Sequence, residues 1–183
     1  MNKIILGLVG PIASGKGTAC QYLKEKYGAE TFRFSTMLRD ILNRVYIENS
    51  RENLQKVSSV LRQTFGDDLM AKTIANDVKN APGQVVAVDG VRREPDIKYL
   101  QEIPGFYLVA INAEQKVRHQ RITRRGENTD DNQKTFEQFQ QDEQQEAEQQ
   151  IKEVAKLAKF HLDNNGSLSD LQRQIDEIIK QVS

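Results

Sequence analysis

The stretch that decides the fold is KIILGLVGPIASGKGT, residues 3–18 of the 183-residue chain. Residues 3–9 form a mostly apolar run, which is typical of a strand buried on both faces of a parallel sheet. Residues 10–16 (GPIASGK) fit the pattern G-x-x-x-x-G-K, and residues 18–27 have helical composition. A buried strand, a glycine-rich turn and a helix in this order predict a loop that wraps around a phosphate.

The chemistry of this loop favours a nucleoside triphosphate, and we expect ATP. Glycines let the backbone N–H groups converge, the start of the helix adds partial positive charge, and Lys16 supplies a mobile cation for the β and γ phosphates. A plain glycine-rich turn with a surface lysine is the alternative. The expected nucleotide contacts are Gly10, Ile12, Ala13, Ser14, Gly15, Lys16, Gly17 and Thr18.

Other segments alternate between strand and helix patterns. Apolar runs predict strands at 31–34, 84–89, 106–111 and 160–162, and helical spacing predicts helices at 51–65, 68–79, 96–101, 114–124, 135–157 and after Ser167. Ser35 is expected to cap a helix whose buried face carries Met37, Leu38, Ile41, Leu42 and Val45. The alternation predicts an α/β fold of three layers around a parallel sheet, in one domain spanning residues 1–183.

Composition excludes several classes of protein. The chain has 26 basic and 26 acidic residues, so a basic nucleic-acid coat protein is disfavoured and no nucleic-acid partner is expected. One cysteine, Cys20, cannot form an internal disulfide, and we expect it to pack in the first helix. The longest apolar run, residues 4–9, is too short for a membrane helix of about 20 residues, and no signal-peptide pattern is present. We therefore expect a cytoplasmic protein without a membrane partner.

Residues 15–18 (GKGT) place Gly17 where a phosphate loop usually has the Ser or Thr that holds Mg²⁺. This version resembles the loop of nucleoside monophosphate kinases, in which phosphates and waters hold most of the metal. Three further segments resemble adenylate-kinase-like proteins: residues 35–39 (STMLR), residues 89–93 (DGVRR) and the arginine-rich residues 118–125 with Asp130 and Asp131. The resemblance covers most of the chain and is greatest to poorly characterised archaeal and bacterial members.

The resemblance implies a nucleoside monophosphate kinase-like fold with a helical acceptor-binding segment at 35–80 and a short lid at 118–135. It assigns Ser35, Arg39 and either Arg92 or Arg93 to the acceptor phosphate, and Lys16, Asp89, Arg121 and Arg125 to catalysis, with Arg121 also on the nucleotide. Asp89 would hold Mg²⁺ through water. Two features depart from the family: Met37 replaces a glycine after Ser-Thr, and residues 89–93 lack the family's proline. The lid carries no cysteine, which excludes a zinc-bound lid.

Plainer interpretations of the same residues remain open. Asp89 fits a turn, Arg39 fits the polar face of a helix, and Arg118, Arg121 and Arg125 at i, i+3 and i+7 fit a solvated face, as does the acidic stretch 142–148.

The expected function is ATP- and Mg²⁺-dependent phosphoryl transfer to a nucleoside or deoxynucleoside monophosphate, by a monomer or homodimer. One alternative is a hydroxyl kinase such as dephospho-coenzyme A kinase. These enzymes commonly carry a carboxylate base after the second strand, where this chain has Ser35 and Thr36. The other alternative is a P-loop ATPase or nucleotide-dependent assembly factor.

Overall fold

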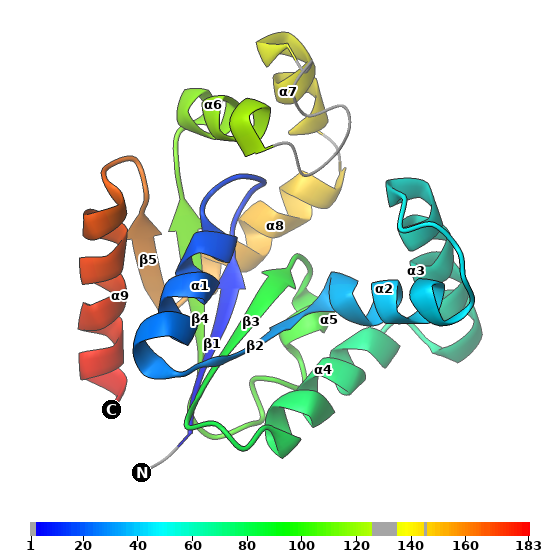
Figure 1. Cartoon of the computed structure of the whole chain (residues 1–183), viewed down its shortest axis with the longest axis horizontal. Coiled ribbons are helices and arrows are strands. Elements are labelled where there is room, and N and C mark those ends of the chain that lie inside the picture. Colours follow the sequence, from blue (N-terminus) through cyan, green and yellow to red (C-terminus); the bar gives the residue numbers. More distant parts are fainter. Residues whose placement is uncertain (1–2, 126–134, 145) are drawn as a thin grey trace.

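The computed structural model describes residues 3–125, 135–144 and 146–183. Its centre is a parallel sheet with the strand order β2-β3-β1-β4-β5 (Figure 1). The strands are β1 (Ile4–Val9), β2 (Glu30–Arg33), β3 (Val85–Val91), β4 (Phe106–Asn112) and β5 (Phe160–Asp163). Because the strands are parallel, the residues that follow β1, β2 and β3 meet at one edge of the sheet.

Helices cover both faces of the sheet and complete the three layers predicted from the sequence. They are α1 (Lys16–Tyr27), α2 (Phe34–Arg44), α3 (Arg51–Phe65), α4 (Leu69–Asn80), α5 (Glu94–Ile97), α6 (Gln115–Arg125), α7 (Phe136–Asp142), α8 (Glu146–Lys156) and α9 (Leu168–Val182). Alternate residues of β1 face opposite layers: Ile4, Leu6 and Leu8 pack with α1 and α9, whereas Ile5 and Val9 pack with α2, α4 and α8. None of these helices is long and apolar enough to cross a membrane.

The start of α2 corrects one expectation. Ser35 does not cap this helix, because the helix begins at Phe34 and Arg33 is its N-cap. The buried residues are Phe34, Leu38 and Leu42, which lie four apart on one face, whereas Ile41 and Val45 are exposed. Phe34 is buried in the core, and the helix begins there, two residues earlier than a cap at Ser35 would place it.

The predicted single helix at 135–157 is wrong, because two helices, α7 and α8, occupy this range. Ile151 and Val154 of α8 pack in the core beneath the sheet, whereas Phe139 of α7 packs against α6. One straight helix cannot reach both places. The break also buries Glu143, so that part of the acidic stretch 142–148 is not a solvated face.

Smaller differences concern element ends. Helix α1 begins at Lys16, two residues before the predicted start, and α5 covers Glu94–Ile97, where a helix at 96–101 was predicted. The predicted packing of Cys20 is confirmed: it is buried between α1 and the sheet, and burial raises the pKa of its thiol to about 12.

We predict that Cys20 in the native protein reacts with a disulfide reagent such as dithionitrobenzoate far more slowly than a free thiol. With a pKa of about 12, roughly one thiol in ten thousand is ionised at pH 8, and the thiolate is the reactive form. Absorbance of the released thiolate measures the rate. The control is the unfolded chain, which should react rapidly with one equivalent; equal rates in both states would contradict the buried position.

Candidate active site

The loop between β1 and α1 is packed too closely for side chains at two glycines. A Cβ on Gly10 would lie 2.2 Å from the backbone oxygen of Ile111 in β4. A Cβ on Gly15 would lie 2.1 Å from Nδ2 of Asn164, and Gly15 has a left-handed φ of 110°. Both positions therefore require glycine, and the loop is held between β4 and the turn that follows β5.

Helix α1 begins directly at the end of this loop. The N–H groups at the start of a helix have no acceptor within the helix, and here they belong to Lys16, Gly17 and Thr18. Ala19 is the first residue to bond back, at 2.9 Å to the oxygen of Gly15. The side chain of Lys16 folds over the loop and donates from Nζ to the oxygens of Gly10 (2.7 Å) and Pro11 (3.0 Å).

Ser14 stabilises the loop from inside. Ser14 is fully buried. Its backbone N–H donates to the backbone oxygen of Pro11 at 3.2 Å, and its backbone oxygen accepts from Nδ2 of Asn164 at 2.7 Å. The Oγ atom of Ser14 has no hydrogen-bond partner among the described residues. Asn164, which sequence reasoning missed, thus anchors the loop to the end of β5.

A cavity of about 550 Å³ lies beside the loop. It runs across the end of β1, from the ends of β2 and β3 on one side to the turn after β5 on the other. Its lining is Ala13, Gly15, Lys16, Gly17, Thr18, Arg33, Asp89, Arg121, Asn164, Leu168 and Leu171. The structure therefore brings together the predicted Lys16, Thr18, Asp89 and Arg121, and adds Arg33 and Asn164.

Arg33 pairs with Asp89 on the β2–β3 side of this cavity. Its Nε and Nη2 atoms lie 2.8 Å and 2.7 Å from Oδ2 of Asp89. The two residues are direct neighbours in the register of β2 and β3. The sequence alone does not reveal the pairing of Arg33 with Asp89, because the pairing depends on the register of the two strands.

Asp89 also offers a place for a magnesium ion. Its Oδ1 atom is buried and has no hydrogen-bond partner among the described residues, although the side chain lines the same cavity as Lys16 and Thr18. A carboxylate oxygen is the kind of ligand that Mg²⁺ prefers, directly or through water. The donor set therefore fits Mg²⁺, and Asp89 and Thr18, which both line the cavity, would hold its waters.

Arg121 lies on the other side of the cavity, toward β5. Its Nη2 donates to the oxygen of Asn164 at 2.8 Å, and its buried Nη1 has no hydrogen-bond partner among the described residues. Burial lowers the pKa of this guanidinium. Arg121 thus offers a desolvated donor on the side opposite Asp89.

The residues expected at the acceptor lie outside the lining of this cavity. Ser35 and Arg39 are half-buried on α2, Arg92 is exposed and Arg93 is half-buried after β3. Nη2 of Arg93 donates to Oδ1 of Asp96 at 3.2 Å, while Oδ2 of Asp96 accepts the N–H groups of Arg92 (3.1 Å) and Arg93 (3.0 Å). The carboxylate therefore orders the turn that presents both arginines.

Arg62 of α3 adds a cation to this group that sequence reasoning missed. Its Nε is buried without a hydrogen-bond partner among the described residues. Burial, and next the neighbouring Arg93, lowers the pKa of Arg62. Arg62, Arg92 and Arg93 therefore lie near one another, with Asp96 and Asp67 as counter-charges, and guanidinium groups gathered in this way can hold an anion.

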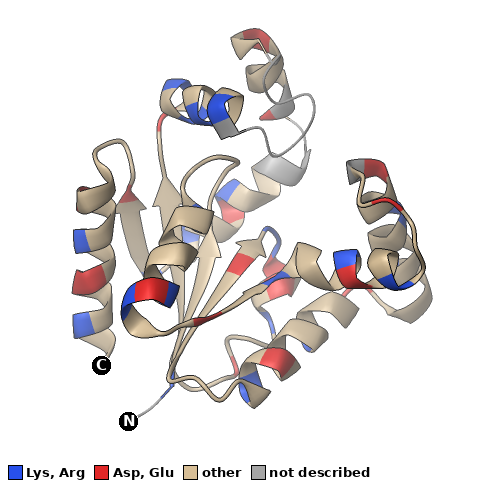
Figure 2. Ribbon diagram, in the orientation of Figure 1, with Lys and Arg blue, Asp and Glu red and all other residues tan. Residues whose placement is uncertain are grey.

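One expectation about the basic helix α6 needs correction, and another concerns residues that the structure does not describe. Figure 2 shows the Lys and Arg residues of α6 beside the loop. Arg118 is neither solvated nor in the cavity lining: it is buried and pairs with Glu143. The side chain of Arg125 and the lid residues 126–134 lie outside the part of the chain that the structure describes.

Comparison with known proteins identifies the family. A family model described as an AAA domain matches residues 9–139, which is most of the chain. The chain belongs to this AAA-domain family. Among curated relatives of this family member, a UPF0200 protein of Hyperthermus butylicus is 25% identical over 182 residues and covers 100% of this chain and 96% of its own. A UPF0200 protein of Methanoregula boonei is 26% identical over 176 residues, covering 96% of this chain and 95% of its own.

Solved structures share the fold of this AAA-domain protein. TT1252 from Thermus thermophilus gives a TM-score of 0.64 at 17% identity, with 100% of each chain covered. Shikimate kinase from Bacteroides thetaiotaomicron gives 0.66 at 12% identity, covering 97% of each chain. A gluconokinase from Sinorhizobium meliloti gives 0.61 at 15% identity, covering 98% of this chain and 93% of its own. These likenesses show a P-loop kinase fold, and together with the archaeal relatives they confirm the resemblance drawn from the sequence.

We predict that Lys16→Ala weakens ATP binding at least tenfold and leaves the fold intact. The ammonium of Lys16 reaches the loop but fills no core position, and one charged hydrogen bond is worth about 1.5–3 kcal/mol. Isothermal titration calorimetry measures the affinity and circular dichroism the fold. The matched control is Lys24→Ala, an exposed residue of the same helix, which should bind like the wild type. Unchanged affinity in Lys16→Ala would remove the loop from the nucleotide site.

Proposed function

We propose that the protein transfers the γ-phosphoryl group of ATP to a nucleoside or deoxynucleoside monophosphate. The observation that carries the proposal is the charge of the cavity. Its described lining has three cations, Lys16, Arg33 and Arg121, against one carboxylate, Asp89, which is already paired with Arg33. This excess of positive charge favours the binding of two anionic substrates, ATP and a monophosphate.

The two substrates would occupy opposite sides of the loop. The β5 side offers the apolar side chains of Leu168 and Leu171, which suit the nucleoside of ATP. The opposite side offers Arg33, with Arg39, Arg62, Arg92 and Arg93 on the adjoining elements, which suit the phosphate of the acceptor.

The chemistry then requires positioning and neutralisation of charge more than proton transfer. The oxygen of a monophosphate is already ionised, so no base is needed to activate it. Donors from Lys16, Gly17 and Thr18 would hold the transferring phosphates, and Mg²⁺ held near Asp89 would supply further positive charge. Arg121 and Arg125 would add guanidinium groups, and their contacts with the transferring phosphoryl group would be strongest in the transition state.

A hydroxyl acceptor is the second candidate. Oδ1 of Asp89 is a buried carboxylate oxygen without a hydrogen-bond partner among the described residues, and such an oxygen can accept the proton of a hydroxyl. The solved structures of shared fold include shikimate kinases and a gluconokinase. The ion pair of Asp89 with Arg33 argues against this role, because Arg33 already engages Oδ2 and leaves only the buried Oδ1 for a hydroxyl.

The deciding experiment measures ADP formation from ATP and Mg²⁺ with a panel of acceptors. The panel contains ribo- and deoxyribonucleoside monophosphates, dephospho-coenzyme A, shikimate and gluconate. Equal amounts of ADP and nucleoside diphosphate with one of the monophosphates support the proposal. Phosphorylation of a hydroxyl compound supports the second candidate, and release of inorganic phosphate without any acceptor indicates an ATPase.

We predict that Arg39→Ala raises the Michaelis constant of the monophosphate about ten- to a hundredfold and leaves that of ATP nearly unchanged. The reason is loss of one charged hydrogen bond to the acceptor, about 1.5–3 kcal/mol. Steady-state kinetics with each substrate varied in turn provide the measurement. Arg44→Ala, exposed near the other end of α2, is the control and should match the wild type. A rise confined to the constant for ATP would move the acceptor site elsewhere.

A further inference from the structure

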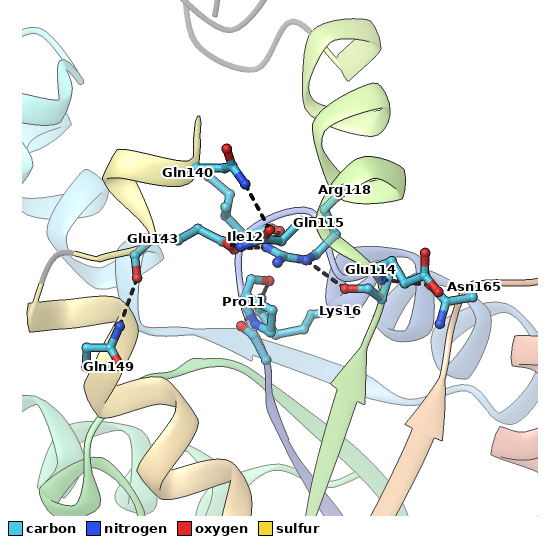
Figure 3. A network of polar contacts seen from close by, with 12 residues as sticks. Pro11, Ile12, Lys16, Glu114, Gln115, Arg118, Gln140, Glu143, Gln149 and Asn165 are labelled. Carbon is cyan, nitrogen blue, oxygen red and sulfur yellow. Dashed lines mark hydrogen bonds and ion pairs between the residues drawn. The ribbon is translucent and has the colours of Figure 1, made fainter. Parts of the chain in front are cut away.

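Arg118 makes a buried contact with the phosphate loop that the proposed chemistry does not use. This residue of α6 is 4% exposed. Its Nε donates to the oxygen of Ala113 at 2.8 Å, and its Nη1 donates to the oxygen of Ile12 in the loop at 3.4 Å (Figure 3). The guanidinium also lies over the ring of Phe139, 5.4 Å from its centre.

Glu143 holds this guanidinium in place. Its Oε1 accepts from Nη1 of Arg118, and its Oε2 accepts from Nε2 of Gln115. Its backbone oxygen accepts from Nε2 of Gln149 at 3.1 Å, which ties the end of α7 to α8 (Figure 3). Arg118 and Glu143 are both almost fully buried, so removal of either charge leaves the other without its partner.

The loop residue beside this contact has an unusual backbone. Ala13 has a φ of 58°, a left-handed conformation that costs a non-glycine residue about 1 kcal/mol or more. The carbonyl of Ile12 and the N–H of Ala13 belong to one planar trans peptide and point in opposite directions. Because Arg118 binds this carbonyl, the N–H of Ala13 is turned away from Arg118, and Ala13 itself lines the cavity.

We infer that Arg118, held by Glu143, is a positioning residue that presets the Ile12–Ala13 peptide to donate its N–H to a bound phosphate. The ion pair stabilises the left-handed conformation of Ala13 before any nucleotide binds. Successive N–H groups arranged in this way form a concave anion site. The inference rests on the donor half of the proposed function, the binding of a triphosphate by the loop, and is independent of the acceptor.

A purely structural role for the pair makes a different prediction. If Arg118 and Glu143 only fasten α6 to α7, their loss lowers the melting temperature and leaves phosphate affinity unchanged in the folded protein. If they preset the loop, affinity falls even where the fold persists. The two roles therefore separate when stability and affinity are measured on the same variants.

The test is isothermal titration calorimetry of the full chain with ATP and, separately, with inorganic tripolyphosphate, without any acceptor. Arg118→Lys keeps the charge for Glu143 but has no second arm for the carbonyls of Ala113 and Ile12. We expect about a tenfold loss of affinity for both ligands, because the loss lies at the phosphates. The matched control is Arg173→Lys, an exposed residue of α9 outside the cavity lining, which should bind like the wild type.

Glu143→Gln provides a second, gentler variant, because its amide oxygen still accepts from Arg118 without the charge. We expect an intermediate loss of affinity, and a smaller change in the amide resonance of Ala13 on addition of tripolyphosphate than in the wild type. This variant decides the matter if Arg118→Lys does not fold.

Affinities within twofold of the wild type in the folded variants would overturn the inference and leave the pair as a structural tie. A wild-type protein that binds neither ATP nor tripolyphosphate would overturn the inference together with the donor half of the proposed function. Normal binding without transfer to any acceptor would contradict only the proposed kinase activity.

Discussion

The loop between β1 and α1 has to pass between the backbone of β4 and the side chain of Asn164, and the rest of the site depends on this passage. A Cβ fits at neither Gly10 nor Gly15, so the loop lies close against both neighbours, and the first residues of α1 after it line the cavity. Because β1 lies between β3 and β4, this path crosses the middle of the sheet. Residues from β2 and β3 then approach the loop from one side, and residues that follow β5 approach from the other.

Carboxylates from neighbouring elements hold the arginines around this loop. Asp89 pairs with Arg33, Asp96 with Arg93 and Glu143 with Arg118. In each pair the carboxylate is buried. Arg33 and Arg93, held in this way, lose little conformational freedom when an anion arrives, which favours tight binding, whereas the buried Arg118 acts on the loop. The Arg33–Asp89 pair differs from the others because it lines the cavity, so an incoming phosphate and the waters of Mg²⁺ would compete for its two partners.

The sequence predicted the parts of this arrangement that depend on local pattern. The strand, the glycine-rich turn and the helix around Lys16 lie close together in the chain, and the alternation of apolar runs indicated the three layers. The pairing of Arg33 with Asp89 depends on strand register, and the position of Asn164 depends on how the turn after β5 packs, so neither is visible as a local pattern. Arg118 was misjudged because its spacing on α6 fits a solvated face, while its partner, Glu143, lies in a stretch whose Gln and Glu residues indicated one continuous exposed helix.

We expect ATP to bind on the side of the loop toward β5 and the acceptor to bind on the side toward β2 and β3. Amide spectra of the ¹⁵N-labelled protein, titrated first with a non-hydrolysable ATP analogue and Mg²⁺ and then with a nucleoside monophosphate, test it most directly. The analogue should shift the amide resonances of Lys16, Gly17, Thr18 and Asn164, and the monophosphate should then shift those of Gly90, Arg92 and Arg93. Unchanged amides at residues 16–18, or a monophosphate whose shifts fall on the β5 side, would contradict it.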